Sequence, residues 1–285
     1  MESDSASKVL SSPIATAQAE LLKSSSAFTS PLFIASTILL GLIVIGVLFY
    51  LTSGSSTFSS RPRNIYLITG LSGSGKTSLF SVLRTKKQVS TYTSIKSNET
   101  YFRPVSDEGE PLTENPLHIV DVPGHEKLRN LEISRIIPEI KAIVVMVDSF
   151  TASKAISQVA EMLYDLLVLK QVVEYQIPVL VVANKRDLAT SVTPERLKTL
   201  LESEINTIRQ TRTSAHLENL GSEGDQESDP SSEGYLGFED KAFEFEDISN
   251  ELSFLPLSLG SAIKNSPFSG NQAQIKEIVS WLTTH

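Results

Sequence analysis

Gly70-Leu-Ser-Gly-Ser-Gly-Lys-Thr77 has the pattern G-x-x-x-x-G-K-T, and this stretch decides how the chain folds. It follows an apolar run typical of a β-strand, Asn64-Ile-Tyr-Leu-Ile-Thr69, and it precedes Ser78-Leu-Phe-Ser-Val-Leu-Arg84, which favours a helix. Glycines let the backbone curl so that its N–H groups face a phosphate, and the helix adds the positive end of its dipole. A Gly/Ser-rich turn that matched by chance would not need these two flanks. The stretch therefore predicts a phosphate-binding loop between a strand and a helix.

The same stretch offers the groups that a nucleoside triphosphate and its metal ion need. We expect the ammonium of Lys76 to lie against the outer phosphates and the hydroxyl of Thr77 to bind Mg²⁺. The residues expected around the phosphates are Gly70, Leu71, Ser72, Gly73, Ser74, Gly75, Lys76, Thr77 and Ser78.

Two later patterns predict the rest of a guanine nucleotide site. An apolar strand runs into Asp121-Val-Pro-Gly124, which predicts a carboxylate that holds Mg²⁺ through water and a glycine N–H near a γ-phosphate. A second apolar run, Pro178-Val-Leu-Val-Val-Ala183, leads into Asn184-Lys-Arg-Asp187. A carboxylate at Asp187 can accept two hydrogen bonds from guanine, whereas adenine lacks that pair of donors. The residues expected to recognise the base are Asn184, Lys185 and Asp187.

A charge-free apolar stretch, Pro31 to Leu51, precedes the phosphate loop. About 20 helical residues cross a hydrocarbon layer of about 30 Å. We expect a disordered tail at 1–30 on the lumenal side, a transmembrane helix at 31–52, a linker at 53–62 and a nucleotide-binding domain at 63–285. A cleaved signal peptide or a buried core helix are the alternatives, but the long N-terminal segment with its acidic residues argues against the former. Arg61 and Arg63 on the C-terminal side indicate that the domain is cytosolic.

Composition narrows the classes of function. The chain has 285 residues, 40% of them hydrophobic, so a sizeable core is available. Its formal net charge of -8 argues against direct nucleic acid binding, which needs a basic surface. The absence of cysteine excludes disulfides, thiolate zinc sites and cysteine nucleophiles.

The β-type runs of the chain predict an α/β fold. With helices between most strands, we expect a three-layer phosphate-loop domain that has a mostly parallel six-stranded sheet and one antiparallel edge strand. One helix is expected from Ala152 to about Tyr175, and a closing helix from Gln272 to Leu282. The strands are expected at 64–69, 99–103, 117–121, 141–148, 178–183 and 252–257.

A long insertion, 213–247, is rich in Ser, Gly, Asp and Glu. Its acidic residues repel one another and few apolar residues are available for a core, so we expect a flexible segment up to about Ser232. The aromatic residues within 234–238 and 243–245 are expected to dock onto the domain. Two interpretations stay open for the insertion, a solvated loop or an element that binds a partner.

The order and spacing of these motifs resemble the small GTPases of the Ras superfamily. Three segments are similar to the family of signal recognition particle receptor β subunits: Thr91-Tyr-Thr-Ser-Ile95, Asp121-Val-Pro-Gly-His-Glu126, and Leu236-Gly-Phe followed by Phe243-Glu-Phe245. The single apolar stretch before the GTPase domain fits that family too. The resemblance implies that Thr93 senses the γ-phosphate and Mg²⁺.

The resemblance also implies a cellular role. In that family the GTP-loaded subunit, anchored in the endoplasmic reticulum membrane, holds the N-terminal domain of the receptor α subunit. We therefore expect the loops around Thr93 and His125 to form the interface with that subunit. Contact with the signal recognition particle, the ribosome and the translocon would be indirect. The rival interpretations are an Arf-like trafficking GTPase and a GTP-dependent scaffold without significant hydrolysis.

Two positions depart from the usual GTPase pattern. Ras-like enzymes have a glutamine where this chain has His125, whose imidazole could orient the attacking water as a catalytic residue or simply pack over the nucleotide. Intrinsic hydrolysis of GTP is expected to be slow. The fifth GTPase motif is expected at Ser258-Leu259, where a backbone N–H would meet the guanine oxygen, and a register centred on Ser261-Ala262 is the alternative.

Overall fold

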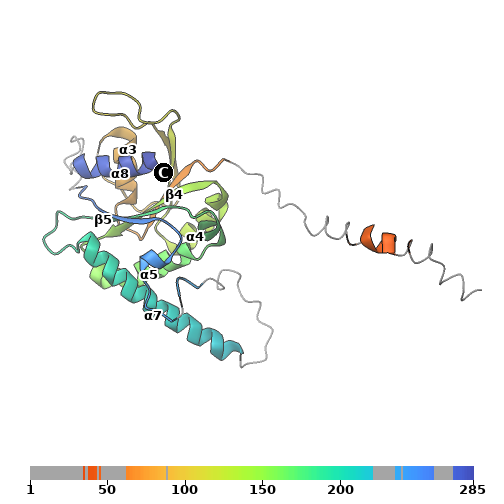
Figure 1. Cartoon of the computed structure of the whole chain (residues 1–285). Coiled ribbons are helices and arrows are strands. Elements are labelled where there is room, and N and C mark those ends of the chain that lie inside the picture. Colours follow the sequence, from red (N-terminus) through yellow and green to blue (C-terminus); the bar gives the residue numbers. More distant parts are fainter. Residues whose placement is uncertain are drawn as a thin grey trace, which may run out of the picture. The chain divides into compact units, whose positions relative to one another are not determined.

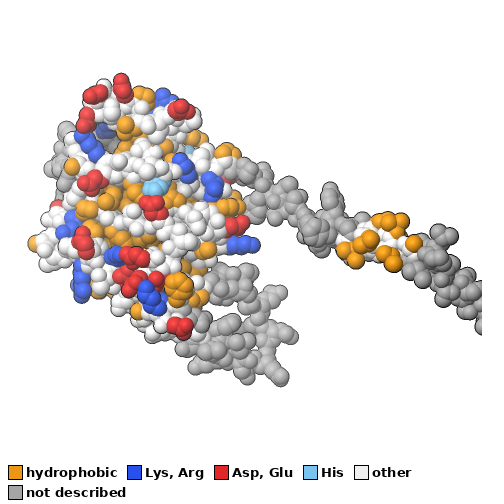
Figure 2. Space-filling view, in the orientation of Figure 1, with side chains coloured by type: hydrophobic (Ala, Val, Ile, Leu, Met, Phe, Trp, Pro, Cys, Tyr) orange, Lys and Arg blue, Asp and Glu red, His pale blue; other side chains and the backbone are white. Residues whose placement is uncertain are grey.

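The structure is a computed structural model that describes residues 35, 38–43, 45, 62–87, 89–220, 235–238, 240–259 and 272–285, with only the backbone described for 214–220. The chain divides into two units, Met1–Ser60 and Arg61–His285. In the first unit the described residues are helical, and their exposed side chains are hydrophobic (Figure 2). The expected tail at 1–30, most of the expected span at 31–52 and nearly all of the linker lie outside the described residues. Within the described part of the chain, no helix has both the length and the apolar character that a membrane span requires.

The second unit is built on a six-stranded sheet with the order β2-β3-β1-β4-β5-β6 (Figure 1). Only the edge strand β2 runs antiparallel to its neighbour, and the other four pairings are parallel. This confirms the expected mostly parallel sheet with one antiparallel edge. The strands are β1 (Ile65–Gly70), β2 (Asn98–Phe102), β3 (Leu117–Asp121), β4 (Ile140–Asp148), β5 (Val179–Asn184) and β6 (Leu252–Pro256).

Helices cover both faces of the sheet, which gives the expected three layers (Figure 1). One face is packed by α3 (Lys76–Thr85) and α8 (Gln272–Thr284). The other face is packed by α4 (Glu126–Ile136), α5 (Ala152–Leu167), α6 (Lys170–Glu174) and α7 (Pro194–Leu220). Short 3₁₀ turns lie at Ile137–Glu139 and Phe245–Asp247. Acidic and basic side chains are interspersed over the face of this unit that Figure 2 shows.

Burial along each strand explains its place in the sheet. Every residue of β1 and β5 is buried, as expected for parallel strands that are covered on both faces. In β2, partly buried and exposed residues alternate, which suits an edge strand. Because β1, β3, β4 and β5 are parallel, their carboxyl ends meet at one edge of the sheet. The three expected sequence motifs all follow strands that end there.

One helix differs from its expected bounds, and another extends into the expected insertion. The helix expected from 152 to about 175 is interrupted between α5 and α6, because Leu169 adopts an extended backbone with ψ of 126°. Helix α7 continues to Leu220 and therefore covers the first residues of the insertion 213–247. The remainder of the insertion is described only at 235–238 and 240–247.

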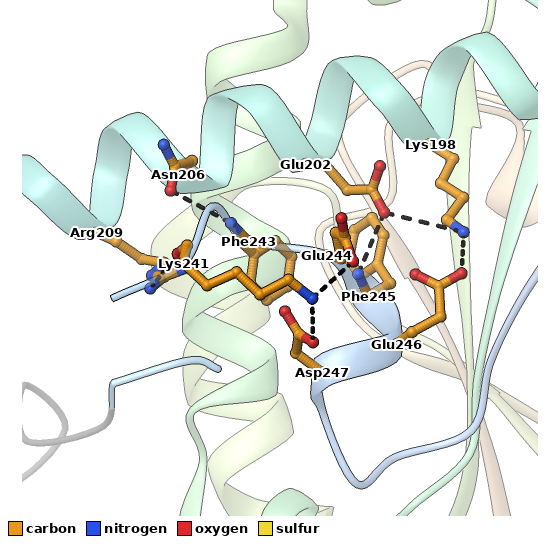
Figure 3. Close-up of polar contacts among 10 residues, drawn as sticks. All are labelled: Lys198, Glu202, Asn206, Arg209, Lys241, Phe243, Glu244, Phe245, Glu246 and Asp247. Carbon is orange, nitrogen blue, oxygen red and sulfur yellow. Dashed lines mark hydrogen bonds and ion pairs between the residues drawn. The ribbon is translucent and has the colours of Figure 1, made fainter. Parts of the chain in front are cut away.

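The end of the insertion, residues 240–247, lies along α7, and we call it the return segment (Figure 3). The backbone N–H of Phe243 donates to Oδ1 of Asn206 at 3.3 Å, and that of Phe245 donates to Oε1 of Glu202 at 3.2 Å. Two residues of extended chain advance about 6.6 Å and four residues of helix about 6 Å, so the two spacings match. Both phenylalanine side chains are buried in the core, as expected from the sequence.

Arg209 of α7 binds residues that precede the return segment and residues at its beginning. Its side chain is only 1% exposed, and its guanidinium lies over the ring of Tyr235 at 4.5 Å. The same guanidinium donates hydrogen bonds to the hydroxyl of Tyr235 and to the carbonyl oxygens of Phe238 and Lys241. The C-terminal part of the insertion is therefore bound to α7.

Candidate functional site

A cavity of about 420 Å³ opens at the carboxyl edge of the sheet. It brings together residues of the phosphate loop, the segment around Thr93, the loop after β3 and the turn after β5. Lys76 and Asp187, which lie 111 positions apart in the sequence, both line it. The expected site residues in its wall are Ser72, Gly73, Gly75, Lys76, Thr77, Ser78, Thr93, Gly124, Asn184, Lys185, Asp187 and Leu259.

The phosphate loop is held by the turn that follows β5. Gly75 has φ of +99°, and a Cβ atom there would lie 2.2 Å from Nδ2 of Asn184. That amide nitrogen donates to the carbonyl oxygen of Ser74 at 2.9 Å. Only glycine allows this approach, so the loop sequence and the turn sequence depend on each other.

Lys76 is buried at the first turn of α3, where its Nζ donates to the carbonyl oxygen of Leu71 at 2.7 Å. Burial lowers the pKa of the ammonium to about 8, although the nearby Asp121 carboxylate acts in the opposite direction. An anionic phosphate beside Lys76 would relieve this cost because it favours the charged form.

Asp121 lies at the end of β3, with its Oδ2 accepting hydrogen bonds from Thr77 Oγ1 at 2.8 Å and from Asn98 Nδ2 at 3.0 Å. Burial raises the pKa of this carboxyl above its ordinary value, against the effect of those two hydrogen bonds. Its Oδ1 is buried and has no hydrogen-bond partner in the described part of the chain. An unpaired carboxylate oxygen beside the Thr77 hydroxyl is an all-oxygen donor set, and this set fits Mg²⁺ with its water ligands. Ser94, one residue after the expected Thr93, contacts Thr77 Oγ1 at 3.2 Å.

Gly124 approaches the phosphate loop closely. A Cβ atom at this position would lie 2.7 Å from the backbone nitrogen of Ser72 and 2.9 Å from Nζ of Lys76. Any larger residue would have to displace the loop backbone. The loop after β3 therefore lies directly beside the groups expected to face the outer phosphates.

The turn after β5 forms the other end of the cavity. Lys185 has a left-handed backbone with φ of +62°, which is uncommon for a residue other than glycine. Its Nζ lies 2.6 Å from Oδ2 of Asp148 at the end of β4, so the conformation is held by an ion pair. The side chains of Asp187 and Leu259 line the cavity beside this turn.

Some expected site residues lie elsewhere. His125 is exposed and is absent from the residues that line this cavity, although it lines a neighbouring cavity that also includes Ser72 and Gly124. Ser258 is also absent from the wall, and its backbone N–H donates to Oε1 of Gln274 at 2.8 Å. The alternative register at Ser261-Ala262 lies outside the described residues. Gly70, Leu71, Ser74 and Asp121 are also absent from the wall, although the last three accept hydrogen bonds from residues that line it.

Several residues of the wall were not predicted from the sequence. Thr91, Tyr92, Ser94, Val122 and Leu188 line the cavity, and each is within two positions of a residue that was assigned. Adjacency to Thr93, Asp121 or Asp187 was the available signal. Asp148 carried no comparable signal, since its role comes from a contact with Lys185 across 37 positions.

Comparison with known proteins tests the resemblance. Residues 61–252 match the family model described as signal recognition particle receptor beta subunit. The chain belongs to this family. The signal recognition particle receptor subunit β of Dictyostelium discoideum is 33% identical over 270 residues, which is 90% of this chain and 85% of that protein. The rat subunit is 31% identical over 216 residues, 76% of this chain and 74% of that protein.

Solved structures agree with the family at the level of the fold. The structure of the mammalian signal recognition particle receptor has a TM-score of 0.61 and 29% identity, and the match covers 77% of this chain and 98% of that one. A Chaetomium thermophilum complex of the β subunit, GTP and SRX has a TM-score of 0.57 and 21% identity over 78% of this chain and 99% of that one. The chain thus shares its overall fold with these two structures.

Proposed function

We propose that this chain is the GTP-binding β subunit of a signal recognition particle receptor. The observation that carries the proposal is the meeting of Lys76 and Asp187 in one cavity at the carboxyl edge of the sheet. A phosphate-binding lysine at one end and a carboxylate after β5 at the other are what a guanine nucleotide requires. Family membership supports the same assignment.

In this proposal each wall residue has a chemical task. The phosphate loop and Lys76 bind the phosphates, and Asp187 accepts the two guanine N–H groups. Thr77 and Thr93 would hold Mg²⁺ directly, and Asp121 would hold it through water. When bound, Mg²⁺ neutralises charge on the phosphate oxygens. A γ-phosphate beside Gly124 would order the loops around Thr93 and His125 into one surface, which GDP would relax.

The partner of that surface is the receptor α subunit, bound through its N-terminal domain. One Chaetomium thermophilum structure is described as an SRb-GTP/SRX complex and two others as SRb-GDP and SRb-GDP-Mg forms, which supports a nucleotide-dependent partnership. Contacts with the signal recognition particle, the ribosome and the translocon would run through the α subunit.

The anchor is part of the proposal. Residues 31–52 would cross the endoplasmic reticulum membrane once, with 1–30 in the lumen, 53–62 as a linker and 63–285 in the cytosol. The absence of charge from Pro31 to Leu51 supports the span, and the hydrophobic exposed side chains at 38–43 suit contact with lipid.

A scaffold that hydrolyses GTP very slowly is the second candidate, and one observation favours it. His125, the residue proposed to orient the attacking water, is exposed and lies outside the wall of the cavity. Single-turnover hydrolysis, measured with and without the α subunit, separates the two candidates. Turnover that depends on His125 would indicate an enzyme, and no turnover under either condition would indicate a scaffold.

The proposed function is tested with the full chain in lipid nanodiscs. We expect GTP and GDP to displace a fluorescent guanine nucleotide, with ATP weaker by about a thousandfold or more. The receptor α subunit should be recovered from solubilised membranes with the GTP-loaded chain and not with the GDP-loaded chain. Equal displacement by ATP would contradict guanine recognition, and equal recovery in both states would contradict the switch.

A further inference from the structure

A second cavity, of about 490 Å³, lies between α4 and α5 on the face of the sheet that is covered by α7. Its floor includes Thr69 of β1, its walls include Arg129 of α4 and Met162 of α5, and Arg212 of α7 closes one side. None of these four residues lines the nucleotide cavity. The volume falls within the usual range for sites that bind small molecules, about 300–1,000 Å³.

Arg129 is the notable group in this cavity. Its side chain is only 5% exposed, yet it makes no ion pair within the described part of the chain. Among the described residues its one hydrogen bond is a long one, 3.4 Å from Nη1 to the carbonyl oxygen of Gly124. A buried guanidinium is costly unless it is paired, because the charge has lost its hydration.

The acidic residues that act on Arg129 do not meet this need. Glu126 and Asp165 act on Arg129 only through longer-range electrostatics. The carboxylate of Asp165 is already paired with Arg212, at 2.7 Å, and the guanidinium of Arg212 lies over the ring of Tyr164 at 4.4 Å. The cavity therefore contains two cations and one carboxylate, which leaves a net positive charge at Arg129.

Thr69 gives an independent indication. Its side chain is 1% exposed, it lines the same cavity, and its Oγ1 has no hydrogen-bond partner among the described residues. Buried hydroxyl groups nearly always have a partner, so an unpaired one that borders a cavity points to a missing polar group. The remaining wall is mostly apolar and includes Ile133, Met162, Leu166 and Leu169.

We propose that this cavity binds a small organic carboxylate, with its acid group on Arg129 and Thr69 and its apolar body against Met162 and Leu166. A carboxylate matches the planar guanidinium and can also accept a hydrogen bond from the Thr69 hydroxyl. Thr69 lies on the sheet, beneath helices about 10 Å in diameter. A free molecule reaches that depth, whereas an acidic side chain on a partner docked against the outer surface does not. The proposal does not depend on the nucleotide assignment.

The test uses the full chain in nanodiscs, labelled with ¹³C at the methionine methyl groups. The chain has 3 methionines, and Met146, which does not line this cavity, serves as an internal reference for Met162. The probes are 4-phenylbutyrate, 4-phenylbutanol and 4-phenylbutylamine, which share one apolar body and differ in the charge of the head group. We expect 4-phenylbutyrate to shift the Met162 signal in a saturable way, with the alcohol and the amine at least about tenfold weaker.

Substitutions test whether Arg129 and Thr69 bind the carboxylate head group of the probe. Arg129→Gln and Thr69→Val should each weaken binding of 4-phenylbutyrate about tenfold or more. Thr69→Val preserves the side-chain volume, so it keeps the test decisive even if Arg129→Gln does not fold. Thr207→Val, on the exposed face of α7, is the matched control and should leave binding unchanged. Equal shifts with all three probes, no shift of Met162, or unchanged binding in both cavity variants would each overturn the proposal.

Discussion

The side-chain amide of Asn184 donates a 2.9 Å hydrogen bond to the carbonyl oxygen of Ser74, and so joins the turn after β5 to the phosphate loop. Both residues are buried, so water does not compete for this bond. The phosphate loop and the turn expected to contact the base are thus hydrogen-bonded to each other in the ligand-free protein. A substitution in one of them should therefore also alter the other.

Asn184→Ala should therefore weaken nucleotide binding without touching the nucleotide's phosphates. Loss of the bond leaves the Ser74 carbonyl unpaired and frees the loop, so we expect a loss of about tenfold in affinity and about 1–2 kcal/mol in the free energy of unfolding. Fluorescent nucleotide titration and urea unfolding measure the two quantities.

Asn250→Ala is the control for that variant. Asn250 is also buried, and its Nδ2 donates to the carbonyl oxygens of Val172 and Ile177, away from the nucleotide cavity. It should lose similar stability and retain nucleotide affinity. If both variants lost affinity equally, the effect would reflect general destabilisation and not the link to Ser74.

Asp187→Asn should change which base is bound. The amide presents a donor where the carboxylate had an acceptor, so GTP should weaken and xanthosine triphosphate, which has a carbonyl in place of the exocyclic amine, should bind better. We expect the preference to shift by at least about a hundredfold, in line with the loss of paired polar contacts. Competition binding that still favours GTP strongly would show that Asp187 does not contact the base.

The pH dependence of nucleotide binding should reveal the titration of the Lys76 ammonium group. Its pKa is about 8 in the ligand-free fold, because burial disfavours the charge, and bound phosphates should raise that pKa. Nucleotide affinity should therefore fall as the pH rises above about 8, by up to about tenfold per pH unit. Lys76→Arg removes the titration, so any affinity it retains should be independent of pH in this range.

The lowered pKa of Lys76 should also make the free energy of unfolding depend on pH. Between pH 8 and the ordinary lysine value of 10.5, the unfolded chain binds more protons at Lys76 than the folded chain does. The contribution of this group to the free energy of unfolding of the ligand-free protein must then rise across that window. Urea unfolding of the wild type and Lys76→Met at several pH values isolates this contribution as the difference in slope.

The sheet and the main motifs follow from the sequence because each depends on a local pattern. The all-buried strands β1 and β5 read as continuous apolar runs, and the glycine-rich loop and Asn184-Lys-Arg-Asp187 each lie within a few residues. The parallel topology then brings those motifs to one edge without further information. This is why most of the residues that line the cavity could be predicted from the sequence.

Features that depend on long-range contacts could not be predicted in this way. The ion pair of Lys185 with Asp148 and the packing of Arg209 on Tyr235 join segments that have no shared pattern. The interruption after α5 was missed because apolar spacing continues across Leu169 although its backbone is extended. The exposure of His125 depends on how α4 begins, which residue type alone does not determine.

Asp121→Asn should separate stability from metal binding. Burial of this carboxyl raises its pKa, so the charged form is disfavoured in the fold, and a neutral amide removes that cost while its oxygen still accepts from Thr77 and Asn98. The ligand-free variant should be as stable as the wild type or more stable by about 1 kcal/mol. The gain in nucleotide affinity that Mg²⁺ produces should fall at least about tenfold. Asp107→Asn, in an exposed ion pair with Lys276, should change neither quantity.

The return segment should behave as part of the domain core and not as a solvated loop. Phe245 is 4% exposed, and its ring centroid lies 5.1 Å from that of Phe243 and 5.5 Å from that of Phe254 in β6. Phe245→Ala should therefore lower the free energy of unfolding by about 3–5 kcal/mol. Phe238→Ala is the matched control, since that side chain is 61% exposed and should cost less than about 0.5 kcal/mol. Equal and small effects of both changes in urea unfolding would mean that the segment does not pack on α7 in solution. A large effect of Phe245→Ala together with unchanged discrimination between GTP and ATP would place the segment's role in stability and leave the nucleotide site independent of it.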